Sequence, residues 1–171
     1  MAALLPIFVN LETVIILGIG FFLLLVFSKR KNFLNSIHKI DDYSIGALLF
    51  TPSLTLTAII FWPLNTLIFQ GAALVLGLSD GIAGVVGARY GRKKYKVTGD
   101  KTIEGSLIFF LITVLILFGV LYINNTAFAL DRALVVFGSS LLLTIVEATF
   151  GKGWDNLFIP IVAGAILYFI L

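Results

Sequence analysis

The sequence has no cysteine, one histidine and few charged residues. Of its 171 residues only 12% are charged, whereas about a quarter are charged in an average soluble domain. The absence of cysteine excludes disulfides, thiolate zinc sites, iron–sulfur clusters and thiol nucleophiles. The one histidine, His38, lies in a polar connection, where a solvated side chain is a better interpretation than a general base. Any catalytic chemistry is therefore expected to use carboxylates, hydroxyls, lysine and arginine.

Long apolar runs dominate the rest of the chain. Hydrophobic residues make up 60% of the sequence, and the mean hydropathy is +1.10. A membrane-spanning helix needs about 20 mostly apolar residues, and here such runs alternate with polar clusters. We therefore predict an all-α, polytopic integral membrane protein that forms a single domain over residues 1–171. Its helices, about six in number, are expected near residues 6–27, 44–62, 66–88, 105–123, 132–150 and 157–171.

The basic residues are distributed unevenly between the connections. Of the twelve Lys and Arg residues, only Arg132 lies outside the first, third and fifth connections. Positive residues concentrate in the cytoplasmic loops of membrane proteins. These three connections are therefore predicted to be cytoplasmic, and both termini are predicted to lie on the outside.

Three carboxylates, Asp80, Glu147 and Asp155, lie at or near the predicted cytoplasmic ends of apolar helices. A charged side chain within a membrane helix costs roughly 2.5–3.5 kcal/mol, so such residues usually face the bundle interior and mark a functional pathway. Asp155 has a simpler interpretation as the N-cap of the last helix, whereas Glu147 interrupts "LLLTIVEATF" and requires a partner, a metal or water. Together the three are candidate ligands of Mg²⁺, which prefers a few carboxylates plus phosphates and water.

Glycines recur at helical spacing in "SDGIAGVVGARYGR", residues 79–92, and include Gly84, Gly87 and Gly91. One interpretation is a seam of small residues that lets a neighbouring helix approach closely. The other is backbone left bare so that an anion can approach. The packing seam explains the glycines within the helix, but neither Asp80 nor the glycines that continue into the basic loop. Access for an anion accounts for both, and the two interpretations stay open.

The third connection contains Arg92, Lys93, Lys94 and Lys101, a composition that suits a bound polyphosphate. Basic cytoplasmic loops are also common as topology signals or as sites for anionic lipid headgroups, but these interpretations do not explain the interleaved acids and glycines of "GDKTIEG". The loop lacks the GxxxxGK[ST] pattern of a P-loop. Its end also predicts a helix start, with Thr102 as the cap and Glu104 in the first turn.

Three stretches in this order, "SDGIAGVVGARYGR", "GDKTIEGS" and "VEATFGKGWDNLFIP", resemble the CTP-dependent lipid-alcohol kinases, the family of phytol kinase, dolichol kinase and CTP-dependent diacylglycerol kinase. The resemblance covers roughly residues 44–171. The matching positions are Asp80, Gly84, Gly87, Gly91, Lys101, Glu104, Gly105, Glu147, Asp155 and Asn156.

The sequence departs from the family at an early Arg-Lys-x-x-His motif, because Arg30 and Lys31 are followed by Leu34 at the position of the histidine. The related phosphatidate cytidylyltransferases share the Lys-Thr-x-Glu-Gly element of residues 101–105. They end, however, in a Pro-Gly-His-Gly-Gly stretch that this sequence lacks. The comparison of motifs therefore favours a kinase over a cytidylyltransferase.

The resemblance implies transfer of the γ-phosphoryl group of CTP, with ATP as an option, to the hydroxyl of a membrane lipid alcohol, with Mg²⁺ and without nucleic acid. The oligomeric state stays open, a homodimer being one option. The alternatives are a cytidylyltransferase that forms a CDP-lipid and a small transporter or channel whose intramembrane acids carry ions. The predicted catalytic and metal-binding residues are Asp80, Glu147 and Asp155, and those for the nucleotide are Gly84, Gly87, Gly91, Arg92, Lys93, Lys94, Lys101, Glu104 and Asn156.

Overall fold

The computed structural model describes residues 2–31, 41–95, 101–125, 130–151 and 153–171. Within these ranges the ordered structure is helical, apart from an isolated antiparallel bridge between Lys94 and Thr102. The predicted all-α class is therefore confirmed. The equivalent of the early Arg-Lys-x-x-His motif extends past residue 31 and so lies partly outside the described residues.

The first predicted helix, residues 6–27, is interrupted near its start. A short 3₁₀ turn, η1 (Ala2–Leu4), leads into α1 (Leu5–Phe8), and the main helix is α2 (Leu11–Lys31). The Oδ1 atom of Asn10 accepts hydrogen bonds from the backbone N of Thr13 at 3.0 Å and from its hydroxyl at 2.6 Å. These bonds satisfy free groups at a helix start, so the apolar helix begins at Leu11 rather than at residue 6.

The second and third predicted helices form a hairpin. Helix α4 (Asp41–Phe61) is followed by a tight turn and α5 (Thr66–Leu74), which Asn65 caps by accepting from the backbone N of Leu67 at 2.9 Å. The chain continues through the π-helical segment η2 (Val75–Asp80) into α6 (Gly81–Tyr90). A π-helical turn inside an α-helix is uncommon and frequently accompanies a functional site. Here it ends at Asp80.

The last three helices are α7 (Ile103–Ile123), α8 (Leu130–Thr149) and α9 (Asp155–Ile170). Thr102 caps α7 as predicted, accepting a hydrogen bond from the backbone N of Gly105 at 3.1 Å. The N-cap interpretation of Asp155 is wrong, because Trp154 occupies the cap position and Asp155 is the first residue of α9. A negative charge in the first helical turn is still favourable, because it faces the positive end of the helix dipole.

Four segments are long and apolar enough to cross a membrane, namely Leu11–Ser28, Thr66–Tyr90, Ile103–Ile123 and Leu130–Thr149. The other two predicted spans contain shorter apolar helices, Ile45–Phe61 and Asp155–Ile170. The protein is thus an integral membrane protein with several apolar helices. Because lipid is as apolar as leucine, helix association in a membrane depends on close packing rather than on exclusion of water. Small residues at crossings serve this packing: Gly71 of α5 faces Val120 and Leu167, and Gly164 of α9 faces Phe61.

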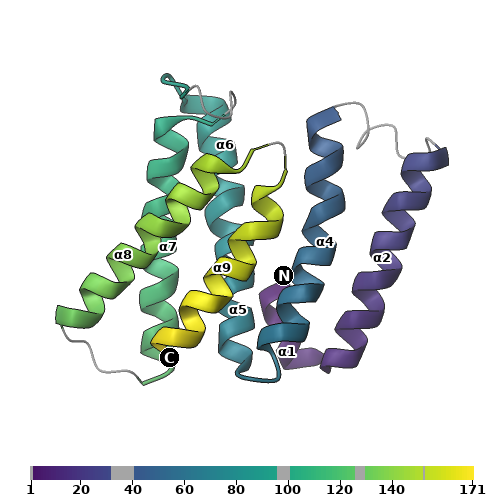
Figure 1. The fold of residues 1–171 in the computed structure, drawn as a ribbon, viewed down its shortest axis with the longest axis horizontal. Helices are drawn as coiled ribbons and strands as arrows, with labels where there is room; N and C mark the ends of the chain where they lie inside the picture. Colours follow the sequence, from purple (N-terminus) through teal and green to yellow (C-terminus); the bar gives the residue numbers. More distant parts are fainter. Residues whose placement is uncertain (1, 32–40, 96–100, 126–129, 152) are drawn as a thin grey trace.

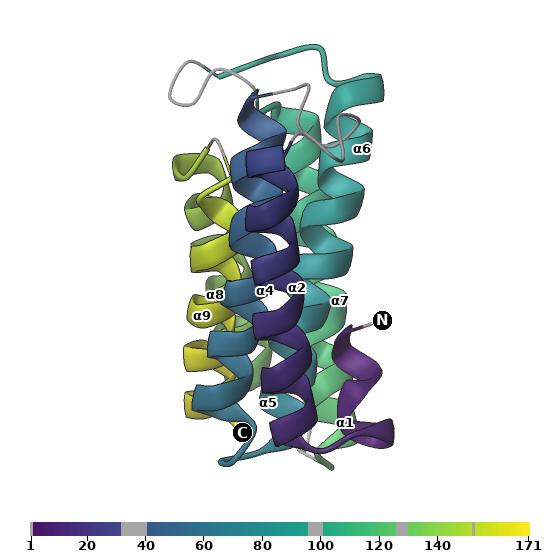
Figure 2. The same cartoon turned by 90° about the vertical axis from the view of Figure 1, so that its right-hand side faces the viewer.

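Figure 1 shows the helices side by side in a bundle with α2 at one edge. Helix α4 packs against α2 and α9, α9 also contacts α5 and α8, and α7 lies between α6 and α8. One end of the bundle contains the helix ends that flank the first, third and fifth connections. There α2, α6 and α8 end, and α4, α7 and α9 begin (Figure 1). Figure 2 shows residues 91–95 crossing this end after α6. The helix ends that flank the three basic connections therefore share one end of the molecule, whereas the cytoplasmic location of these connections stays a prediction.

Candidate active site

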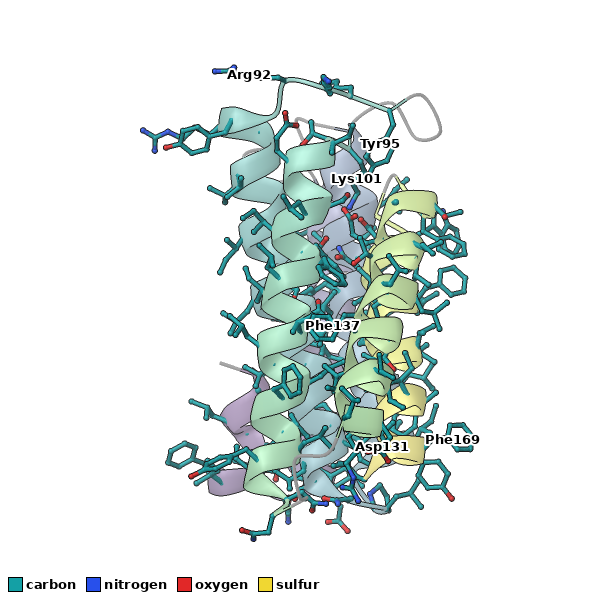
Figure 3. The ribbon with its side chains drawn as sticks, turned by 90° about the vertical axis from the view of Figure 1, so that its left-hand side faces the viewer. Arg92, Tyr95, Lys101, Asp131, Phe137 and Phe169 are labelled. Carbon is teal, nitrogen blue, oxygen red and sulfur yellow. The ribbon has the colours of Figure 1, made fainter. Side chains whose placement is uncertain are left out.

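Lys101 lies among the three carboxylates that the sequence singled out. Its Nζ atom is 2.6 Å from Asp155 Oδ2, 2.7 Å from Glu147 Oε1 and 3.6 Å from Asp80 Oδ1. The acids come from three separate segments: Asp80 from the π-helical turn, Glu147 from the end of α8 and Asp155 from the start of α9. Figure 3 shows Lys101 reaching into the end of the bundle from the start of α7. We call these four residues the carboxylate cluster.

The carboxylate cluster has an excess of negative charge, because one ammonium group faces three carboxyl groups. Burial by itself would lower the pKa of Lys101, but the charges of Glu147, Asp155 and Asp80 outweigh burial and raise its pKa above the usual value. Lys101 therefore remains a cation throughout the physiological pH range. The sequence assigned this lysine to nucleotide phosphates, and in this structure it neutralises the acids.

The three acids differ in how firmly they are held. The side chain of Glu147 is 3% exposed, and its second oxygen, Oε2, accepts a hydrogen bond from Ser106 Oγ at 2.8 Å. The side chain of Asp155 is 10% exposed, and its second oxygen, Oδ1, accepts from the backbone N of Asn156 at 3.0 Å. Asp80 is 23% exposed, and its charged partner within the described residues is the more distant Lys101 ammonium. Asp80 is thus the acid with the most freedom to meet a substrate.

Two residues of the site, Ser106 and Tyr95, were not identified from the sequence. The hydroxyl of Tyr95 lies 2.5 Å from Ser106 Oγ, which in turn bonds Glu147. Ser106 follows Thr102 by four positions and so lies on the same face of α7 as the helix cap, a signal that could have identified it. Tyr95 gave no comparable signal, because nothing in the sequence indicates which residues of a long loop turn inward.

The glycines of α6 fall into two groups. A Cβ atom built on Gly87 would lie 2.9 Å from Thr102 Oγ1 and 3.7 Å from the Cα of Gly105, and one built on Gly91 would also meet Thr102. These glycines form a packing seam between α6 and the start of α7. Gly84 differs, because no described atom lies within 4 Å of its Cβ position. The seam thus accounts for Gly87 and Gly91, and a role of any of the three in phosphate binding stays a prediction.

We expect Gly87→Ala to destabilise the protein by about 1–3 kcal/mol, because the added methyl group overpacks the contact with Thr102. The matched control is Gly119→Ala on α7, where no described atom lies within 4 Å of the Cβ position. That change should stabilise the helix by roughly 0.5–1 kcal/mol. Unfolding of both variants in detergent checks the prediction, and equal stability would contradict the packing seam.

The basic loop after α6 is held by backbone pairing beside the carboxylate cluster. The backbone N of Ile103 donates to Lys93 O at 3.1 Å, and that of Tyr95 donates to Lys101 O at 3.3 Å. Lys93 and Lys94 are exposed, so their ammonium groups are accessible to a ligand. Arg92 is also exposed and lies farther out than Lys101, at the edge of the molecule (Figure 3).

Two predicted nucleotide-binding residues make contacts within the protein. Glu104 Oε2 accepts a long hydrogen bond of 3.5 Å from the backbone N of Lys93, which links the first turn of α7 to the loop. Asn156 Nδ2 donates to Gly46 O at 3.0 Å and so ties α9 to α4. Neither contact brings the side chain to Lys101 Nζ, and a role of either residue toward the nucleotide stays a prediction.

The carboxylate cluster suits a divalent cation in its chemistry. Within the described residues, no group of three His, Cys, Asp or Glu side chains has the geometry of a metal site, and the three acids of the cluster contact Lys101. Carboxylate oxygens are nevertheless the ligands that Mg²⁺ prefers, and the cluster has negative charge that one lysine does not balance. The donor set therefore fits magnesium in charge and in ligand type.

Comparison with known proteins supports the resemblance drawn from the motifs. The chain is 32% identical over 139 residues to a phytol kinase from Synechocystis sp.. The matched region covers 80% of this chain, and the chain spans 59% of the length of that relative. No model of a protein family and no solved structure matches the chain. The similarity to a phytol kinase confirms the resemblance to lipid-alcohol kinases.

Proposed function

We propose that this protein is a CTP-dependent kinase that phosphorylates the hydroxyl of a membrane lipid alcohol, with an isoprenoid such as phytol as the first candidate. The observation that carries the proposal is the carboxylate cluster, in which three acids and a lysine meet beside a basic loop at one end of an apolar helix bundle. The similarity to a phytol kinase supports the same conclusion. Phosphoryl transfer depends mainly on positioning and on charge neutralisation, and this set of residues is suited to both.

In the proposed reaction the lipid hydroxyl oxygen attacks the γ-phosphorus of CTP. The bond between that phosphorus and the bridging oxygen breaks, CDP leaves, and the hydroxyl proton is transferred to a base. Asp80 is our candidate for the base, because it is the most exposed acid of the carboxylate cluster and lies 3.6 Å from its nearest charged partner. A positioned general base typically contributes a factor of about 10²–10⁴ to the rate.

Lys101 is our candidate for the cation that contacts the transferred phosphoryl group. Its ammonium already lies next to Asp80, where the hydroxyl would bind, and its pKa ensures that it stays charged. Exposed Lys93 and Lys94 extend the positive charge outward along the same loop for the remaining phosphates, with Arg92 beyond them. Lysine contacts phosphate as a compact, mobile charge, so Lys101 can exchange a carboxylate for a phosphate oxygen.

Magnesium, held by Asp80, Glu147 and Asp155, would supply neutralisation of the charge on the transferred phosphoryl group. The lipid is expected to approach along α6. Gly77, Gly81 and Gly84 lie within four residues of Asp80 in the sequence, and no described atom lies within 4 Å of their Cβ positions. Bare backbone there leaves room for a chain beside the reacting carboxylate. With the basic loop in the cytoplasm, nucleotide and lipid would reach the site from different phases.

Product analysis tests the proposed reaction. We expect purified protein incubated with Mg²⁺, CTP and phytol to produce phytyl phosphate and CDP, with ATP, geranylgeraniol, polyprenol and diacylglycerol as parallel substrates. Label on the γ-phosphate should appear in the lipid, and label on the α-phosphate should remain in CDP. Release of pyrophosphate with α-label in the lipid would instead identify a cytidylyltransferase. Absence of nucleotide turnover with every alcohol would contradict the kinase.

A further inference from the structure

We propose that Ser106 and Tyr95 are positioning residues that hold the carboxylate of Glu147 during phosphoryl transfer. This inference rests on the proposed kinase function. Glu147 is buried, and its two oxygens are held by different groups: Oε1 by the Lys101 ammonium at 2.7 Å and Oε2 by the Ser106 hydroxyl at 2.8 Å. Ser106 is the last residue of the motif "GDKTIEGS", but no role was predicted for it from the sequence.

The direction of the hydrogen-bond chain follows from the groups in it. An ionised carboxylate only accepts, so Ser106 must give its single hydroxyl hydrogen to Glu147. The contact of 2.5 Å between Tyr95 and Ser106 then requires the tyrosine hydroxyl to donate. Burial, partly offset by the Ser106 hydrogen bond, raises the pKa of Tyr95, which keeps its hydroxyl protonated and able to donate.

Both arms of the basic loop therefore reach the same carboxylate. Lys101 on one arm contacts Glu147 directly, and Tyr95 on the other contacts it through Ser106. The two arms are paired by the hydrogen bond from Tyr95 N to Lys101 O at 3.3 Å. The orientation of Glu147 is thus tied to the position of the loop that is proposed to bind phosphate.

This arrangement meets a requirement of the reaction. When Lys101 turns toward a phosphate, the buried Glu147 carboxylate loses the contact with its ammonium, and burial of that charge stays tolerable only if other groups hold it. The bond from Ser106, strengthened by the donation from Tyr95, stays in place because neither hydroxyl has to move with the ammonium. Glu147 then keeps its orientation through the transfer.

A double-mutant cycle in the full-length protein tests the positioning role. We expect Ser106→Ala to lower kcat about 10-fold, the scale of one hydrogen bond to a charged group, with KM for CTP changed less than about 2-fold. Tyr95→Phe should lower kcat by about 3-fold alone and have no effect when Ser106 is already alanine, because it acts through that hydroxyl. Ser106→Thr, which keeps the hydroxyl, should restore most of the rate.

The control is Tyr122→Phe, an exposed tyrosine at the end of α7 remote from Lys101, which should leave kcat unchanged. Independent effects of Tyr95→Phe and Ser106→Ala on kcat would overturn the positioning role. A lower rate that is fully explained by a lower amount of folded protein in every variant, including Tyr95→Phe and Ser106→Thr, would also overturn it. If wild-type protein turns over CTP and all variants have the same kcat, the positioning role is overturned while the proposed kinase function stands. Inactive wild-type protein would overturn both.

Discussion

Replacing Lys101 with methionine is expected to destabilise the protein by about 3–5 kcal/mol, the usual effect of removing one partner from a buried ion pair. Methionine keeps the apolar stem but removes the ammonium that lies 2.6–2.7 Å from Asp155 and Glu147. Both acids are almost fully buried and would face each other without a cation. Chemical unfolding in detergent micelles measures the loss, and the kinase assay should show no turnover, because the proposed phosphate contact is removed as well.

The second step of this experiment separates stability from catalysis. In Lys101→Met, adding Glu147→Gln removes one of the charges left without a partner, so we expect part of the lost stability to return while activity stays absent. Lys94→Met is the matched control for stability, because Lys94 is exposed and its substitution should change the free energy of unfolding by less than about 0.5 kcal/mol. A fully stable Lys101→Met protein would contradict the central role of this lysine in the carboxylate cluster.

Much of the fold could be predicted because a membrane leaves few choices for a chain of this composition. A backbone surrounded by lipid must satisfy its hydrogen bonds internally, so each apolar run of sufficient length becomes a helix. Departures occur where a local detail outweighs hydrophobicity. The Asn10 cap moves the start of α2 to Leu11. The π-helical turn Val75–Asp80 could not be predicted, because no residue of "VLGLSD" favours a π-helix over an α-helix.

The site divides in the same way into predictable and unpredictable parts. The three acids could be predicted because a carboxylate in an apolar helix is costly and is usually kept for a function. The structure brings Asp80, Glu147 and Asp155 together around Lys101. The contacts of the Lys101 side chain could not be predicted, because a lysine in a long loop can extend either outward to a ligand or inward to the acids. Gly87 shows a further limit: close helix packing and backbone access to an anion require the same residue.

Asp80→Asn is expected to lower kcat by about 10²–10⁴-fold while the protein stays folded. The amide keeps the size of the side chain but cannot take the proton of the attacking hydroxyl. Stability should hold, because the carboxylate cluster has more negative charge than Lys101 balances, and neutralising its most exposed acid reduces repulsion between Asp80 and the other two. Steady-state kinetics with CTP and phytol, combined with unfolding in detergent, measure the two effects separately.

The same substitution at the other end of the bundle provides the control. Asp131 is exposed in the first turn of α8, far from Lys101 in Figure 3, and Asp131→Asn should leave kcat unchanged. If Asp80→Asn retains near wild-type turnover, the base must be another group, and the greater exposure of Asp80 is unrelated to catalysis. If it loses activity only by unfolding, Asp80 is a structural acid. Loss of rate in a folded protein shows instead that Asp80 takes part in the reaction, as the proposed base or as a ligand of the proposed magnesium ion.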